Sequence, residues 1–175
     1  MLIIKNKSVV EDDWTILRLN ENETGLNENE TAENVAVAAG KVIVPLKVWL
    51  AQRSQLQHRA DLGLWLNSDE RPEELKNDIA KFSVIAVNFP RFADGRGYSI
   101  AFNLRARLGY SGELRAIGDV LRDQMFYMQR VGFDAFAPRP DRNIHDALKG
   151  LSDFSETYQT SVDQKQPLFR RVSRV

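Results

Sequence analysis

The chain has 175 residues, of which 43% are hydrophobic and 27% are charged, as in an ordinary globular domain with a real core. Its 24 basic and 24 acidic residues cancel, so no general field favours nucleic acid or an anionic membrane. Cysteine is absent, which excludes disulfides, thiolate-ligated iron–sulfur clusters, cysteine-ligated zinc and a cysteine nucleophile. We therefore expect a single domain over residues 1–175, with no nucleic-acid partner.

The N-terminal segment contains two short apolar stretches, at residues 2–4 and 9–10, which predict a β-hairpin that residues 14–19 extend. These stretches are too short for a signal peptide, and no apolar run approaches the roughly 20 residues that cross a bilayer. We expect a cytoplasmic protein without a membrane partner. Residues 20–34, rich in Asn, Glu and Thr, predict a mobile loop.

From residue 42 onward, apolar runs typical of buried strands alternate with helical patterns. Val42–Val44 leads into a helix that Pro45 opens. Four strands are then predicted, at residues 62–66, 84–89, 114–118 and 134–137, each followed by a helix. The last of these helices has the cleanest apolar stripe, formed by Ile144, Ala147, Leu148, Leu151, Phe154 and Tyr158.

This alternation of strands and helices indicates an α/β fold of about four βα units with a parallel sheet, either half of a barrel or a small open sheet. Closing a barrel with a filled interior takes roughly eight strands, so four leave one side of the sheet uncovered. We expect the N-terminal hairpin and the helix after Pro45 to cover that side, or a symmetric homodimer to do so.

A first candidate site lies between the second predicted strand and the next helix, where residues 90–99 read PRFADGRGYS. Gly95 and Gly97 allow a sharp turn and close approach of the backbone to a ligand. Arg91 and Arg96 could clamp a phosphate, sulfate or carboxylate beside a helix N-terminus. The alternative is a tight turn in which Asp94 caps the helix and Arg96 is solvated.

A second candidate follows the third predicted strand, where Asp119, Arg122 and Asp123 come together. If the sheet is parallel, these side chains reach the same rim as Asp94, and the three aspartates could act as general acids or bases. The alternative is that Asp119 caps the next helix and that Asp123 interacts with its dipole.

Three further features carry weaker signals. Asn88, at the end of the second predicted strand, could orient a polar ligand or satisfy loop backbone groups. The two histidines, His58 and His145, fall in different units, so we expect no metal site. The polar and basic tail, residues 160–175, could dock on an acidic partner or fray in solvent.

Four segments of the sequence resemble those of a known protein family. The longest covers residues 87–136 and reads VNFPRFADGRGYSIAFNLRARLGYSGELRAIGDVLRDQMFYMQRVGFDAF. Other phrases lie outside it, namely VIVPLKVWLAQR at 42–53, LGLWLNSDERPEEL at 62–75 and DFSETYQTSVDQKQPLFRR at 153–171. Together they closely resemble a bacterial family known as domain of unknown function 934, whose members are labelled as oxidoreductases of sulfite reduction. Many members carry Cys where this chain has Val131, so a thiol at that position is not a general requirement.

The resemblance implies a role in sulfate assimilation, with the sulfite reductase haemoprotein as partner. We expect an accessory protein of assimilatory sulfite reduction whose strand-end rim binds an oxyanion. The alternative is an oxidoreductase or other enzyme acting on a small anionic substrate, with Asp94, Asp119 or Asp123 moving protons. No nucleotide-binding fingerprint is present, and the cofactor is left open because flavin sites need no short motif.

Overall fold

The computed structural model describes residues 1–19 and 31–172. Eight strands are present in these ranges, namely β1 (Leu2–Lys5), β2 (Ser8–Glu11), β3 (Thr15–Ile16), β4 (Val42–Pro45), β5 (Leu62–Leu66), β6 (Val84–Phe89), β7 (Glu113–Gly118) and β8 (Ala135–Phe136). The α-helices are α1 (Leu46–Leu56), α2 (Arg96–Phe102), α3 (Arg122–Arg130), α4 (Ile144–Lys149) and α5 (Leu168–Arg171). Shorter helical turns are η1 (Pro72–Leu75), η2 (Ile79–Lys81), the π-helical η3 (Asn103–Arg107) and η4 (Gly150–Ser152).

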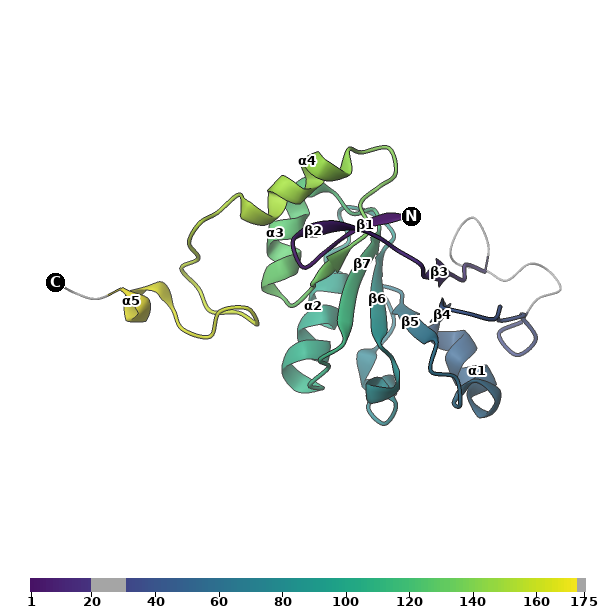
Figure 1. Ribbon diagram of the computed structural model, residues 1–175. Helices are drawn as coiled ribbons and strands as arrows, with labels where there is room; N and C mark the ends of the chain where they lie inside the picture. Colours follow the sequence, from purple (N-terminus) through teal and green to yellow (C-terminus); the bar gives the residue numbers. More distant parts are fainter. Residues whose placement is uncertain (20–30, 173–175) are drawn as a thin grey trace.

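The strands form one curled sheet in the order β2-β1-β8-β7-β6-β5-β4-β3 (Figure 1). From β3 to β8 each strand pairs in parallel with the next one along the chain, whereas β1 runs antiparallel to both β2 and β8. Sequential parallel pairing places successive crossover connections on one face, as in a barrel. The fold is therefore an α/β half-barrel with an N-terminal hairpin, and the predicted fold class is confirmed.

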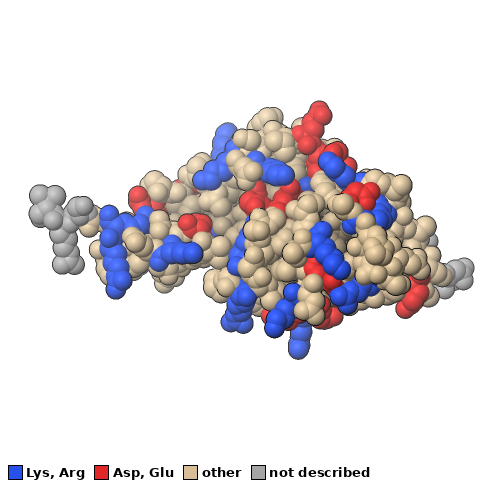
Figure 2. Space-filling view, turned by 60° about the horizontal axis from the view of Figure 1, so that its bottom comes forward, with Lys and Arg blue, Asp and Glu red and all other residues tan. Residues whose placement is uncertain are grey.

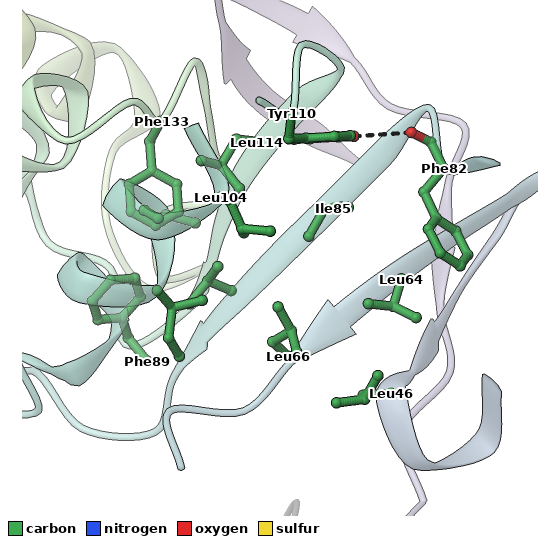
Figure 3. Close-up of a cluster of buried hydrophobic side chains, with 14 of the residues drawn as sticks. Leu46, Leu64, Leu66, Phe82, Ile85, Phe89, Leu104, Tyr110, Leu114 and Phe133 are labelled. Carbon is green, nitrogen blue, oxygen red and sulfur yellow. Dashed lines mark hydrogen bonds between the residues drawn. The ribbon is translucent and has the colours of Figure 1, made fainter. Parts of the chain in front are cut away.

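The helical face of the sheet carries the larger core. Because side chains alternate along a strand, Ile85 and Val87 of β6 face the helices while Val84 and Ala86 face the other way. Figure 3 shows side chains of the helical face, among them Leu64, Leu104 and Leu114. At the edge of this core the Tyr110 hydroxyl lies 3.1 Å from the Phe82 carbonyl oxygen, which accepts its hydrogen bond.

The opposite, inner face of the sheet is covered by a segment of the chain that we call the strap, residues 12–18. Trp14 and Ile16 of the strap pack on a second apolar cluster formed by Ile43, Trp65, Val84, Ala86 and Ile117. The strap leaves the hairpin at one edge of the sheet and joins β4 at the other edge as β3. The chain itself thus covers the face that four βα units alone would leave open.

A buried ion pair holds the strap on the sheet. Arg115 of β7 is 1% exposed, and its Nη1 and Nη2 atoms donate to the two carboxylate oxygens of Asp12 at 2.7 and 2.9 Å. Its Nε atom donates to Glu113 at 2.7 Å, and Glu113 also pairs with Lys5 of the hairpin at 2.7 Å. Each buried charge is therefore paired, as its desolvation requires.

Several sequence predictions at the N-terminal side were wrong in detail. Residues 14–19 do not extend the hairpin, because Thr15 and Ile16 pair with β4 at the far edge of the sheet. Residues 42–45 form a strand rather than only a lead into a helix, and Pro45 is its last residue. The helix α1 packs on the helical face through Trp49, so it does not help the hairpin to cover the inner face. Most of the predicted loop 20–34 lies outside the described residues.

Two predicted helices are also shorter than expected. The helix expected after residue 69 is two short turns, η1 and η2, with Asp78 between them binding Arg53 and Lys81. The helical stripe expected up to Tyr158 ends at η4, because the chain turns there and Phe154 packs against Phe126 of α3 at 4.9 Å between ring centroids. Phe154 and Tyr158 consequently lie on an extended segment rather than on a helix.

We expect Asp12→Ala to lower the free energy of unfolding by about 3 kcal/mol, because it leaves the buried Arg115 without its main partner. Urea unfolding followed by tryptophan fluorescence measures the change. Asp13→Ala is the matched control, since the neighbouring Asp13 pairs with Lys41 at the surface and its side chain is 69% exposed. Equal unfolding midpoints for the two variants would contradict the role of the buried pair.

Candidate functional site

The candidate site is the strand-end rim, which we define as residues 67–68, 90–97 and 118–124. These segments follow β5, β6 and β7 directly. Because these strands are parallel neighbours, their carboxyl ends meet at the same edge of the sheet. The rim therefore gathers the two polar segments singled out in the sequence.

Asp94 and Arg96 form a closed pair on this rim. Asp94 Oδ1 accepts hydrogen bonds from the Arg96 Nε atom at 2.9 Å and from its backbone N–H at 3.2 Å. Asp94 Oδ2 accepts from Arg96 Nη2 and from the Ser68 hydroxyl, both at 2.7 Å. Ser68 is buried at the end of β5, so it fixes the carboxylate in place. Arg96 is thus bound to Asp94 rather than simply solvated.

This arrangement determines the charge of Asp94. The Arg96 guanidinium, together with the Ser68 hydroxyl, holds the pKa of the Asp94 carboxyl well below its usual value of 3.8. The group is therefore ionised throughout the neutral range, which suits an ion-pair partner better than a proton carrier. The stability that it contributes is fully present above its usual pKa and is lost as the pH falls below that value.

Of the two glycines in this loop, packing requires Gly97 but not Gly95. A side chain at Gly97 would meet the Phe89 ring at 2.7 Å, so Gly97 allows α2 to pack closely against the end of β6. Gly95 has open space around its Cα and a negative φ of −81°, so no contact requires a glycine there. Close approach of a ligand is consequently not needed to explain Gly97.

Asp119 links the two rim segments. Its Oδ2 atom accepts from the Phe92 backbone N–H at 2.7 Å, and its Oδ1 atom accepts from Arg139 Nη1 at 3.2 Å. Gln124 strengthens the link, because its Nε2 atom donates to the Phe92 carbonyl oxygen at 2.7 Å. Asp119 does not cap α3, which begins at Arg122 after an extended Leu121.

The remaining predicted site residues lie in different surroundings. Asn88 is fully buried on the inner face and donates to Asn67 Oδ1 at 3.2 Å. Arg91 is exposed; its backbone carbonyl oxygen accepts from the Asp94 N–H at 2.9 Å, and within the described ranges its guanidinium makes no hydrogen bond or ion pair. Arg122 turns toward α4 and pairs with Asp146 at 3.1 Å and Asp153 at 3.3 Å. Asp123 lines a cavity beside Arg122. Arg122 therefore takes part in a different network from Asp94 and Arg96.

Two arginines that the sequence reasoning did not select also reach the rim. Arg139 follows β8 and forms a two-point pair with Asp141 at 2.9 and 3.0 Å in addition to its bond with Asp119. Arg18 comes from the strap. Both line a hollow of about 370 Å³ together with Phe89, Pro90, Gly118 and Asp119.

The hollow adjoins a second cavity of about 530 Å³ on the inner face, which shares Arg18 and Gly118 with it. Gly118 has a φ of +90°, and a side chain there would collide with the Phe89 carbonyl group. The backbone conformation and this close contact therefore require a glycine at the place where the two cavities meet. A basic residue three positions after β8 was the sequence signal for Arg139.

Other classes of site receive no support from the geometry. Among residues 1–19 and 31–172 no group of three or more histidine and acidic side chains is placed to hold a metal ion. No helix in the same ranges is long and apolar enough to cross a bilayer. What the rim offers is guanidinium groups held by carboxylates beside a hollow at the strand ends.

The family model described as "Bacterial protein of unknown function (DUF934)" matches residues 63–169. The chain belongs to this family. The match runs from β5 into α5 and so includes every residue of the strand-end rim. No curated protein and no solved structure matches the chain.

We expect Arg96→Ala to raise the pKa of the Asp94 carboxyl toward its usual value, because the guanidinium is the largest cause of its depression. A carbon-13 NMR titration of the carboxyl groups between pH 2 and 7 measures this change. Glu70 is an internal reference, since burial raises its pKa and Arg96 plays no part in that shift. An Asp94 resonance that titrates identically in both proteins would contradict the assigned pair.

Proposed function

We propose that this protein is a cytoplasmic accessory protein of assimilatory sulfite reduction. It acts with the sulfite reductase haemoprotein, and its strand-end rim binds a small oxyanion such as sulfite or sulfate. The resemblance of the sequence to its family supplies the metabolic context. The observation that supports the oxyanion is the hollow of about 370 Å³ lined by Arg18 and Arg139.

The guanidinium groups of the rim keep donors for such a ligand. Arg139 uses its Nε, Nη1 and Nη2 atoms in three hydrogen bonds to Asp119 and Asp141, which leaves two of its five N–H donors. Arg96 binds Asp94 and Ser68 through Nε and Nη2, and its two Nη1 donors have no acceptor within the described ranges. Oxygen atoms of sulfite or sulfate accept such charge-assisted hydrogen bonds well.

Two carboxylates beside the hollow position Arg139 and also limit the affinity for an anion. Asp119 and Asp141 pair with Arg139, so its guanidinium keeps its position before an anion binds. An incoming anion repels these carboxylates, which weakens its affinity. We therefore expect modest affinity, in keeping with a substrate-handling or partner-docking role rather than tight storage.

A second candidate function is catalysis on a small anionic substrate. Asp119 favours it, because this carboxylate lines the same hollow as Arg18 and Arg139 and would face a substrate bound there. It could then act as a general acid or base. Purified protein that consumes sulfite with reduced viologen as electron donor would favour this enzyme. A chain that only raises the activity of added haemoprotein would favour the accessory role.

We expect Arg139→Ala to abolish growth on sulfate, but not on cysteine, in a strain whose own copy of the gene is deleted. The loss of the Arg139 guanidinium, which lines the hollow beside the rim, removes the anion contact while leaving the apolar core untouched. Growth of complemented strains on each sulfur source measures the effect. Arg96→Ala tests the other half of the rim in the same way.

The matched control is Arg107→Ala, which removes an exposed arginine of η3 away from the rim. Circular dichroism and gel filtration of each variant establish that it is folded. Full growth on sulfate with soluble Arg139→Ala and Arg96→Ala proteins would rule out the rim as the functional site. Binding of sulfite followed by calorimetry separates loss of the anion from loss of a protein partner.

A further inference from the structure

The cavity on the inner face, which we call the inner-face cavity, offers more room than a small oxyanion needs. It has a volume of about 530 Å³, and it shares Arg18 and Gly118 with the hollow of about 370 Å³. Pockets of roughly 300–1,000 Å³ commonly hold organic ligands. The two adjoining cavities can therefore hold a molecule much larger than sulfite or sulfate.

The walls of the inner-face cavity are mainly apolar. Its apolar side chains include those of Trp14, Ile16, Ile117, Ala137, Pro138 and Pro140. The two carboxylates that also line it are already paired. Arg115 donates to Asp12 at 2.7 and 2.9 Å, and Lys41 donates to Asp13 at 2.6 Å. A solvent-accessible apolar surface with paired charges around it suits an apolar group of a ligand.

The walls change in character between the two cavities. Along the strap, Trp14 and Ile16 line the inner-face cavity, whereas Arg18 also lines the hollow. In the loop after β8, Ala137 lines the inner-face cavity and Arg139 lines the hollow. Each wall therefore contributes apolar side chains to one cavity and an arginine to the other. A ligand that matches both cavities has an apolar part and an anionic part.

The loop after β8 holds its apolar and basic side chains at a fixed spacing. Prolines flank Arg139 on both sides, and their rings restrict the backbone there. The Ala137 N–H donates to the Ala116 carbonyl oxygen at 2.9 Å, and the Arg139 N–H donates to the Val120 carbonyl oxygen at 3.2 Å. The wall is thus anchored to β7 and to the residues after it. Such a preformed site loses little conformational entropy when a ligand binds.

We propose that the site binds an organic anion, in which a sulfonate, sulfate ester or phosphate ester group is attached to an apolar ring. The anionic group occupies the hollow, where Arg139 keeps two N–H donors, and the ring lies in the inner-face cavity against Trp14 and Ala137. This inference rests on the oxyanion site of the proposed function and names the class of molecule that carries the anion. Asp119 and Asp141 weaken the binding of a bare anion, and burial of the ring offsets that repulsion.

A second place on the molecule combines basic and aromatic side chains. Figure 2 shows basic side chains gathered at the C-terminal end of the described chain, where the Arg170 guanidinium lies 5.9 Å from the centre of the Phe169 ring. Both side chains are exposed. Arg170→Ala is therefore the matched control for an aromatic anion that binds outside the two cavities.

Naphthalene-2-sulfonate is a suitable probe, because it joins a sulfonate group to an apolar ring. Calorimetry on the full chain at constant ionic strength compares its affinity with that of sulfite. We expect the probe to bind roughly tenfold more tightly than sulfite or better, since its ring is buried, and excess sulfate to compete with it. Arg139→Ala should weaken the binding of the probe by about tenfold or more, whereas Arg170→Ala should leave it unchanged.

The outcomes separate this inference from the proposed function. A probe that binds no more tightly than sulfite overturns the inference and leaves the oxyanion site intact. Binding of neither the probe nor sulfite overturns both. A probe affinity that falls with Arg170→Ala but not with Arg139→Ala also overturns the inference, because the ring anion then lies outside the two cavities.

Ala137→Phe tests the position of the ring. A phenyl side chain there fills part of the inner-face cavity, so the advantage of naphthalene-2-sulfonate over sulfite should disappear while the affinity for sulfite stays the same. Ala106→Phe, at an exposed position of η3, is the matched control. Unchanged probe affinity in folded Ala137→Phe protein overturns the inference. If this variant does not fold, the comparison of Arg139→Ala with Arg170→Ala still decides the outcome.

Discussion

The paired charge of Arg115 is the constraint on which the inner side of this half-barrel depends. An arginine on the inner face of β7 stands where a barrel would place an apolar side chain, and it is 1% exposed. A guanidinium cannot be buried alone, so the chain must bring carboxylates to it. Asp12 and Glu113 meet this need, and Asp12 brings the strap with it. The charge thereby selects one position for the strap, which apolar contacts alone would specify less sharply.

The position of the strap in turn shapes the rim. After crossing the inner face, the strap runs up beside β4, and the Trp65 indole donates to the Leu17 carbonyl oxygen at 3.0 Å. Arg18 then comes to the carboxyl ends of β6 and β7, where it lines the hollow with Arg139. The hollow thus takes one arginine from the strap and the other from the loop after β8. Without the strap, an α/β sheet of this kind would lack Arg18 in the hollow.

Much of the fold was predictable because its central strands are buried on both faces. Residues 62–66 and 84–89 are almost entirely apolar, a pattern that few other structures explain. The edge strands were not predictable in the same way. Thr15 and Ile16 form a strand of two residues whose pairing depends on a contact with β4 far along the chain. Local sequence patterns carry no information about such a partner.

The candidate site also has a part that the sequence predicts and a part that it does not. The positions of Asp94, Arg96 and Asp119 after parallel strands follow from the βα rhythm, and all three lie on the rim. Their pairings do not follow from it, since Ser68 and Arg139 come from neighbouring loops. The prediction that the last helix continues to Tyr158 was wrong for a related reason. Its apolar spacing is equally compatible with the extended segment observed there, on which Phe154 and Tyr158 are exposed.

The strap has a consequence for how the protein is made. Asp12 and Arg115 are separated by 103 positions, so the N-terminal segment leaves the ribosome long before its partner strand exists. The hairpin faces the same delay, because Ile4 of β1 pairs with Phe136 of β8. Ile3, Ile4 and Trp14 must therefore wait in solvent during most of synthesis, and contacts so distant in sequence form slowly. The hairpin and the strap are therefore synthesised before the strands that they contact and complete their folding late, and during that interval their apolar side chains are open to chaperones and to aggregation.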